Sequence, residues 1–274
     1  MLRHLLLIAF LATPIFAATS PTTRQWTVDD IQREALVYAP PSATTQPSPL
    51  IFAFHGHGGR MPYLANRLAF QDAWPQAIVV YPQGIPTPGK LTDKEGKLPG
   101  WQSGPLEQND RDLKFFDAML ESMEKEYKVD QNRVFATGHS NGASFTYVLW
   151  AVRRDRIAAF APIASAYFHF FNAEQNGGAK DIDKIFRPIL HIAGENDPLV
   201  KFEWQEHTVD MLRRINRCGA AEPAGKGVTR YPSTAGADVV LFVHDQKHAI
   251  PPEAQKLIVD FFKAAPAIGV VDKH

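Results

Sequence analysis

One stretch, residues 133–143, constrains the fold of this chain more than any other. Its first part is short, apolar and rich in β-forming residues, which is typical of a strand buried on both faces of a parallel sheet. After Ser140 the sequence changes to small residues followed by an amphipathic helical pattern. Gly138 and Gly142 flank this serine, and a serine in a sharp strand-to-helix turn needs neighbours without side chains. We therefore predict that Ser140 is a nucleophile at such a turn, in preference to a purely structural turn.

The composition indicates a globular chain without a dominant charge. It has 274 residues, of which 45% are hydrophobic, and can bury a large core as one α/β domain or as two smaller ones. Lys and Arg together number 29, as do Asp and Glu, so no overall charge would attract nucleic acid or an anionic membrane. The single cysteine, Cys218, excludes an intrachain disulfide, and we expect it to be a small buried residue.

The N-terminus has the pattern of a targeting signal. A short basic start precedes an apolar run from Leu5 to Phe16, and Ala17 offers a small residue for cleavage. Because the run is too short to span a membrane comfortably, a cleaved signal is favoured over an uncleaved anchor. We expect residues 1–17 to direct export to the periplasm or the exterior, with no stable membrane insertion afterwards.

After this signal we predict a loose polar lead-in over residues 18–32, one α/β domain over residues 33–265 and a short tail over residues 266–274. Besides the strand before Ser140, apolar runs predict strands at residues 35–40, 50–54, 77–81, 158–163, 188–193 and 239–243. Helical patterns follow Asn109, which is expected to cap its helix, and cover residues 203–216 and 251–262. The pattern predicts a mostly parallel sheet with helices on both faces.

The strand at residues 50–54 leads into a glycine-rich segment that contains His55 and His57. In hydrolases with such a serine turn, the loop after this strand supplies one backbone N–H of the oxyanion hole. We therefore expect the N–H groups of His57 and Asn141 to form the hole. A metal site on the two histidines is disfavoured, because no acidic residue or further histidine lies at ligand spacing. We expect neither a metal nor a cofactor.

Two aromatic residues are candidate substrate contacts. Trp101 lies in the long loop after the strand at residues 77–81, and loops at the carboxyl ends of parallel strands build the pocket in open α/β sheets. Trp101 either contacts substrate or holds this loop to the core. Phe168 belongs to an aromatic cluster that either walls an acyl pocket or forms a satellite core.

A catalytic acid and base would follow Ser140 in the chain, in that order. The turn after the strand at residues 188–193 contains Glu195 and Asp197. We favour Asp197, because a proline stops the turn that holds it; the alternative is that it only caps its own turn. The base must come after the last predicted strand, where we favour His248 over His244, which still belongs to the strand's end.

Several motifs together resemble the esterase family that groups polyhydroxybutyrate depolymerases with feruloyl esterases. They appear in the order Phe54–Gly56, Asp112–Phe116, Val134–Gly142, Gly194–Asp197 and Lys247–Pro251. The resemblance covers nearly the whole chain after the signal. It implies an α/β-hydrolase fold with Ser140, His248 and Asp197 as a catalytic triad.

Two departures from this family bear on the substrate. Such proteins often carry Cys after the first His-Gly, where this chain has His57, and an aromatic residue two positions beyond the base, where this chain has Ile250. Neither departure touches the triad.

The sequence thus predicts an exported serine esterase that acts through an acyl-enzyme on soluble esters. Its substrates would be feruloyl or acetyl esters of oligosaccharides, or short hydroxyalkanoate oligomers. A polyhydroxyalkanoate depolymerase, an acyltransferase and a serine peptidase share the triad and are the alternatives; a binding protein is disfavoured because no triad position is missing. We expect little adsorption to polymer granules, because the sequence has no Ser/Thr-rich or Gly-rich spacer. The oligomeric state is not indicated.

Overall fold

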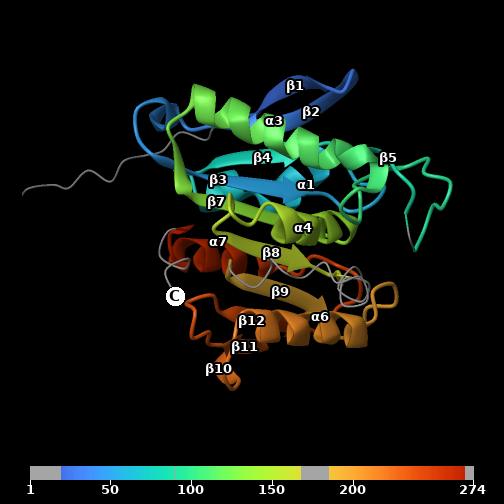
Figure 1. Ribbon diagram of the computed structural model, residues 1–274, viewed down its shortest axis with the longest axis vertical. Helices are drawn as coiled ribbons and strands as arrows, with labels where there is room; N and C mark the ends of the chain where they lie inside the picture. The colour runs from blue at the N-terminus through green and yellow to red at the C-terminus, as the bar shows by residue number, and fades with distance from the viewer. Residues whose placement is uncertain (1–19, 90, 168–184, 269–274) are drawn as a thin grey trace, which may run out of the picture.

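The computed structural model describes residues 20–89, 91–167 and 185–268, so the predicted signal lies outside the described residues. A single 10-stranded sheet forms the centre of the molecule (Figure 1). Its strands are β1 (Thr22–Val28), β2 (Ile31–Tyr38), β3 (Ser48–Phe54), β4 (Ile78–Pro82), β7 (Val129–His139), β8 (Ala159–Ile163), β9 (Ile189–Gly194), β10 (Glu222–Gly225), β11 (Val228–Tyr231) and β12 (Val239–His244). The predicted strands are all present, with ends that differ by a few residues.

The sheet has the order β1-β2-β4-β3-β7-β8-β9-β12-β11-β10. Its central strands, from β4 to β12 in this order, pair in parallel. The strands at both edges pair antiparallel. Because the central strands are parallel, their carboxyl ends meet along one edge of the sheet, and the loops that follow them share that edge.

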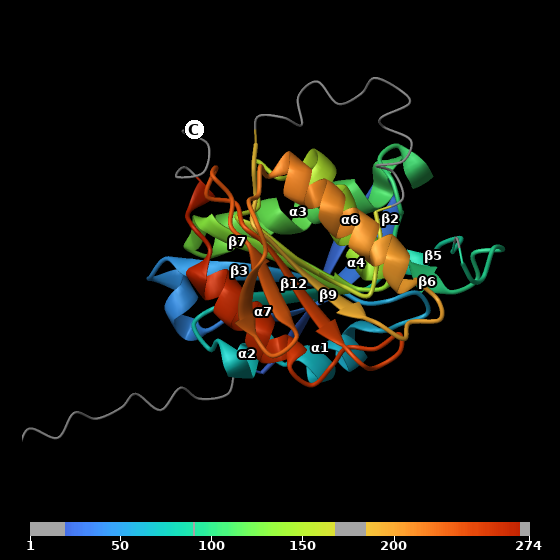
Figure 2. The same cartoon turned by 90° about the horizontal axis from the view of Figure 1, so that it is seen from below.

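Helices cover both faces of the sheet, as predicted (Figure 2). They are α1 (Met61–Leu68), α2 (Phe70–Ala73), α3 (Arg111–Glu126), α4 (Asn141–Val152), α6 (Phe202–Ile215) and α7 (Ala254–Ala264). The buried side chains of α3, α4 and α6 belong to one core cluster, and those of α1, α2 and α7 to a second cluster. No helix in the described part of the chain combines the length and the apolar character needed to cross a bilayer.

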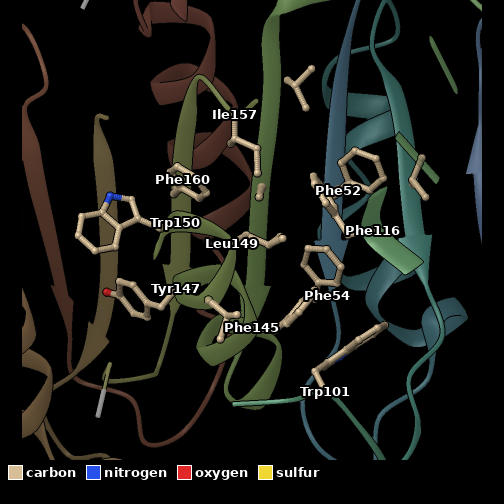
Figure 3. Packing of buried hydrophobic residues seen from close by; sticks show 14 of the residues in the cluster. Phe52, Phe54, Trp101, Phe116, Phe145, Tyr147, Leu149, Trp150, Ile157 and Phe160 are labelled. Carbon is tan, nitrogen blue, oxygen red and sulfur yellow. The ribbon is translucent and has the colours of Figure 1, made fainter. Parts of the chain in front are cut away.

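Strand β3 shows how the sheet separates the two cores. All its residues are buried. Phe52 and Phe54 point into the cluster beneath α3 and α4, whereas Ile51 points into the opposite cluster. In Figure 3 the rings of Phe52 and Phe116 lie against each other, with centroids 4.9 Å apart. Burying each such ring stabilises the fold by about 1.5–3 kcal/mol relative to leaving it exposed.

The prediction of a loose lead-in is wrong, because β1 and β2 form an antiparallel hairpin at the edge of the sheet. The hairpin turns at Asp29 and Asp30, both with positive φ (48° and 62°), as a tight turn between twisted strands requires. Along β1, partly buried residues alternate with exposed ones. Trp26 packs edge-on against Phe115 of α3, with ring centroids 5.8 Å apart. The sequence signal for this strand was weak: one large apolar residue, Trp26, among polar ones.

Two helix starts also differ from the predictions. Asn109 does not cap α3; it lies in a 3-10 turn (Glu107–Asp110) with φ 56°, and Asp110 precedes the helix. Asp110 instead accepts hydrogen bonds from the Leu106 N–H at 2.7 Å and from the Gln102 amide at 2.9 Å. The turn is therefore organised by the loop before it. The last helix begins at Ala254, after the two prolines that were expected to start it.

A second, two-stranded sheet pairs β5 (Ile85–Pro86) with β6 (Pro99–Gly100). The loop between them projects from the end of the molecule toward which the parallel strands point (Figure 1). This small hairpin therefore lies at the edge where the loops after the strands meet.

Candidate active site

Ser140 lies between the end of β7 and the start of α4, with φ 56°. A positive φ is strained for a residue other than glycine, so the surrounding structure must hold Ser140 in this conformation. The flanking glycines let the backbone segments around the turn come close together. A Cβ on Gly138 would lie 2.4 Å from the Gly142 carbonyl oxygen, and one on Gly142 would lie 2.2 Å from the Phe54 carbonyl oxygen. The predicted sharp strand-to-helix turn is therefore present, and both glycines are required by close backbone contact.

A continuous chain of hydrogen bonds runs from Ser140 through His248 to Asp197. The Ser140 hydroxyl lies 2.7 Å from Nε2 of His248, and Nδ1 of His248 lies 2.7 Å from Oδ2 of Asp197. With Nδ1–H donating to the carboxylate, Nε2 is free to accept the serine proton. The structure thus brings together three residues that are 51 and 108 positions apart in sequence.

The second oxygen of Asp197 is held by its own turn. Oδ1 accepts hydrogen bonds from the N–H groups of Leu199 at 2.8 Å and Val200 at 2.9 Å. The Asp197 side chain is 0% exposed, whereas Glu195 is exposed. Two backbone donors therefore fix the carboxylate so that its other oxygen faces the imidazole.

His244 occupies a different environment from His248. It is the last residue of β12 and is only 7% exposed, so burial lowers its pKa. Its Nδ1 accepts a hydrogen bond from the Gln246 N–H at 3.2 Å. His244 therefore contributes to the end of the strand, while His248 lies further along the loop beside the serine.

A second histidine lies beside the His248 ring. His139 has its ring centroid 5.0 Å from that of His248, and burial lowers its pKa to about 3. It is therefore neutral near pH 7 and adds no positive charge next to the imidazole. The loop that carries His248 is also held by α1, because Arg67 of this helix donates a hydrogen bond to the Ile250 carbonyl.

One cavity contains Ser140 and His248 together with His57 and Asn141, the predicted oxyanion residues. It has about 640 Å³ of empty space, including the part open to solvent. Asn141 is the first residue of α4, where backbone N–H groups lack partners within the helix. Among the described residues, neither the His57 N–H nor the Asn141 N–H has a hydrogen-bond acceptor. Because both residues line the cavity, these N–H groups remain the candidate oxyanion donors.

His55 fixes the start of the loop that carries His57. Its Nδ1–H donates to the Gly56 carbonyl at 2.8 Å, and its Nε2 accepts from the Gly84 N–H at 2.9 Å and from the Gln83 amide at 3.0 Å. Burial lowers the His55 pKa to about 4, so the ring is neutral and can accept these bonds. Gln83 and Gly84, which follow β4, were not predicted as part of the site.

Trp101, predicted either to contact substrate or to hold its loop to the core, is not among the residues that line the cavity. Its side chain is 0% exposed, and its ring stacks on Phe145 and meets Phe54 edge-on (Figure 3). The indole N–H donates to the His55 carbonyl at 2.9 Å. These contacts tie the loop of Trp101 to the core, as the second of the two interpretations expects. The other predicted contact, Phe168, lies outside the described residues.

In residues 20–89, 91–167 and 185–268, no group of three or more His, Cys, Asp or Glu side chains is placed to hold a metal ion. Cys218 is a free, partly buried thiol packed at the edge of the core, and burial raises its pKa.

The sequence pattern of the acetyl xylan esterase (AXE1) family matches residues 29–187, which is more than half of the chain. The chain belongs to this family. The match includes the β3 loop, Trp101 and the serine turn, whereas Asp197 and His248 come after it.

Curated relatives of this acetyl xylan esterase family member are also esterases by name. The chain is 26% identical over 224 residues to a bifunctional acetylxylan esterase/xylanase of Neocallimastix patriciarum, covering 79% of this chain and 29% of the relative. It is 29% identical over 221 residues to feruloyl esterase C of Emericella nidulans, covering 74% of this chain and 73% of the relative. The predicted resemblance to feruloyl esterases is confirmed.

Solved structures establish the fold. An acetyl xylan esterase from Aspergillus awamori superposes with a TM-score of 0.65 at 14% identity, covering 88% of this chain and 99% of that one. An S-formylglutathione hydrolase from Agrobacterium tumefaciens gives a TM-score of 0.60 at 13% identity, covering 92% of this chain and 98% of that one. The predicted α/β-hydrolase fold is confirmed, and so, at the level of the family, is the class of carboxylic ester hydrolase.

Proposed function

We propose that this protein is a serine esterase that removes acetyl or feruloyl groups from xylan-type saccharides through an acyl-enzyme. The observation that carries the proposal is the hydrogen-bonded chain of Ser140, His248 and Asp197, with 2.7 Å at each step, in a cavity that also contains two free backbone N–H groups. This set of groups has the parts that acyl transfer requires: a nucleophile, a base, an orienting acid and an oxyanion site.

In the acylation step, Ser140 Oγ attacks the carbonyl carbon of the ester while its proton moves to Nε2 of His248. Asp197 stabilises the imidazolium that forms and keeps it in the correct orientation. The C–O bond to the sugar then breaks, and the proton on Nε2 passes to the departing alcohol oxygen. The acyl group remains on Ser140.

Deacylation repeats these steps with water. His248 takes a proton from water, the hydroxide oxygen attacks the acyl carbon, and Ser140 leaves with the proton returned from Nε2. In both steps the negative oxygen of the tetrahedral intermediate would accept hydrogen bonds from the N–H groups of His57 and Asn141. Removing one such donor from an enzyme site typically costs about 10²- to 10³-fold in turnover.

The choice of ester rests on the family and on the residues that line the cavity. The family match and the names of the relatives support acetyl and feruloyl esters of xylan. Two half-exposed leucines, Leu91 and Leu199, line the cavity together with the hydroxyl groups of Ser144 and Ser165. Such a site offers apolar surface to an acyl group and polar groups to a saccharide.

The test is a substrate panel with Ser140→Ala as the control. 4-Nitrophenyl acetate, methyl ferulate, acetylated xylan and feruloylated xylo-oligosaccharides would be assayed beside the matching amides, and an added alcohol would reveal acyl transfer. We expect turnover of the esters, little turnover of the amides, and free acid as the main product. A serine-directed phosphonate should label Ser140. An inactive wild-type protein, or Ser140→Ala with wild-type activity, would contradict the proposal.

Export is part of the proposal. The basic start and apolar run within residues 1–17 support a cleaved signal. Expression of the full chain in a bacterium, followed by N-terminal sequencing of the protein recovered outside the cytoplasm, checks this. A mature protein that begins close to Ala18 is expected, and an intact Met1 on active protein in the cytoplasm alone would argue against export.

A further inference from the structure

His57 lines the cavity, and its side chain is anchored by a residue of another loop. Its Nε2 lies 3.1 Å from Oδ2 of Asp93, which belongs to the loop between β5 and β6. The two side chains are only 10% and 12% exposed. With Nε2–H donating to the carboxylate, the ring is held by a charge-assisted hydrogen bond. His57 is also one of the two positions at which the chain departs from the family resemblance.

Asp93 in turn organises the loop that carries it. It has φ 46°, and its carboxylate accepts hydrogen bonds from the Leu98 N–H at 2.8 Å and the Lys97 N–H at 3.2 Å. Its carbonyl accepts from the N–H groups of Gly89 at 3.1 Å and Gly96 at 3.0 Å. These bonds to backbone donors help to keep the carboxylate charged, and they lower the Asp93 pKa. The loop is therefore closed around one side chain.

The end of the same loop reaches both oxyanion residues. The Pro99 carbonyl accepts from the Gly58 N–H at 2.7 Å, next to His57. A Cβ on Gly100 would lie 2.6 Å from Nδ1 of His57, so only glycine lets the imidazole lie against the backbone here.

The following residue, Trp101, holds the second donor. The Trp101 N–H donates to Oδ1 of Asn141 at 2.8 Å, and the Asn141 amide donates to the Trp101 carbonyl at 2.9 Å. Together with the buried indole, this pair of bonds fixes the first residue of α4 against the loop.

We infer that Asp93 is a positioning residue for the oxyanion hole, which it holds in place through the His57 side chain and the β5–β6 loop. An oxyanion hole accelerates a reaction because its donors already point to where the charge develops, so a small displacement of the donors is costly. Leu91 and Thr92, on the same loop, line the cavity. Asp93 therefore connects the wall that meets the substrate with the group that stabilises its transition state. The inference rests on the proposed function.

The first experiment compares Asp93→Ala and Asp93→Asn with Glu95→Gln. Glu95 is in the same loop, is 72% exposed and pairs with the exposed Lys97, so it is a matched control. With a soluble ester, we expect Asp93→Ala to lower kcat by about 10- to 100-fold while KM changes by less than about 3-fold. Asp93→Asn should lose less, because its amide oxygen still accepts from the loop. Glu95→Gln should match the wild type.

A second readout separates positioning from a merely structural role. A trifluoromethyl ketone forms a hemiketal with the serine whose negative oxygen occupies the oxyanion hole. Its inhibition constant should rise in the Asp93 variants by the same factor as kcat falls. His57→Leu should show the same pattern, and His57→Gln, whose amide can still donate to Asp93, should recover part of it.

The outcomes are distinct from those of the proposed function. A wild-type protein that neither hydrolyses esters nor reacts with a phosphonate removes the proposed function itself. An active wild type with unchanged kcat in Asp93→Ala, or a loss in KM alone with no change in ketone affinity, overturns the role of Asp93. Thermal midpoints are recorded for each variant, and if Asp93→Ala unfolds below the assay temperature, the same criteria apply to Asp93→Asn.

Discussion

The Tyr147 hydroxyl donates a hydrogen bond to Nδ1 of His191 at 2.5 Å, and both side chains are buried. Tyr147 lies on α4, the helix that begins just after Ser140, and His191 lies on β9, the strand that leads to Asp197. On its other side, Nε2–H of His191 donates to Gln205 at 3.1 Å. Since burial lowers the His191 pKa to about 4, the ring is neutral and can accept on one nitrogen while it donates on the other. This network joins the helix of the nucleophile to the strand of the acid.

Gln205 extends the network to the turn of the acid. Its amide donates to the Val200 carbonyl at 2.8 Å, and the Val200 N–H donates to Asp197 at 2.9 Å. We expect Gln205→Leu to lower the free energy of unfolding by about 2 kcal/mol, because it leaves buried polar groups unpaired. It should also lower kcat by about 10-fold through displacement of Asp197. Urea denaturation and ester turnover measure both effects, and Glu206→Leu, an exposed change on the same helix, is the control. Wild-type kcat in Gln205→Leu would show that the turn holds Asp197 without this support.

The two histidines after the last strand should respond differently to removal. His248→Ala takes away the group within 2.7 Å of both Ser140 and Asp197, and turnover should fall by at least about 10⁴-fold. His244→Ala removes a buried ring at the end of β12 and should lower stability while turnover changes by less than about 10-fold. Steady-state kinetics and thermal midpoints on both variants decide the point. The reverse ranking would assign the base to His244.

Buried histidines, among them His55, His139 and His191, make stability depend on pH. Burial lowers the pKa of His55 and of His191 from 6.5 to about 4. Between about pH 4 and pH 6.5 the unfolded chain binds more protons than the folded one. The free energy of unfolding therefore falls as the pH drops from about 6.5 to 4. Each histidine contributes up to about 1.4 kcal/mol per pH unit in this window, and nothing above it.

Urea denaturation at a series of pH values measures this slope. His191→Gln, which cannot gain a charge, should flatten it, whereas His207→Gln, at an exposed position on α6, should leave it unchanged. An equal slope in wild type and His191→Gln would show that His191 does not carry the effect.

The buried ion pair between Arg33 and Asp112 supports the loop that carries Trp101. Their atoms are 2.8 Å apart, and the second Asp112 oxygen accepts from the Gln102 N–H at 2.8 Å. Asp112→Ala leaves the guanidinium buried without its partner and should lower the free energy of unfolding by about 3–5 kcal/mol. The double variant Arg33→Met/Asp112→Leu should lose less, because it buries no charge. Urea denaturation measures the free energy of unfolding of both variants. If Asp112→Ala is as stable as the double variant, or more stable, this account is contradicted.

Much of the site could be predicted because the fold orders it along the chain. Ser140, Asp197 and His248 each follow a buried, apolar strand, and parallel strands bring their carboxyl ends to one edge. A local glycine pattern marked the serine turn. Their catalytic roles stay predictions, while the arrangement that those roles need is present.

The rest depends on contacts that leave no local pattern. Asp93 is one of two acidic residues in a polar loop, and only the folded chain brings it 3.1 Å from His57. Trp101 could be read as a substrate contact because its loop was correctly placed at the pocket edge, but sequence does not show which way a ring turns. The strand β1 was missed because its polar residues and single tryptophan resemble a loop when its partner β2 is not in view.

The last prediction concerns which acyl group the cavity prefers. Leu91 and Leu199 line the cavity and are 49% and 44% exposed, so an aromatic acyl group could bury them further, whereas an acetyl group is too short to cover much of either. Burying a whole leucine is worth about 1.5–3 kcal/mol, and a half-exposed one correspondingly less. We therefore expect Leu91→Ser and Leu199→Ser each to lower kcat/KM for methyl ferulate by about 3- to 10-fold, with little change for an acetyl ester. Leu106→Ser is the control, because Leu106 is 84% exposed and does not line the cavity. An equal loss on both esters would show that the leucines act on the fold of the loops rather than on the acyl group.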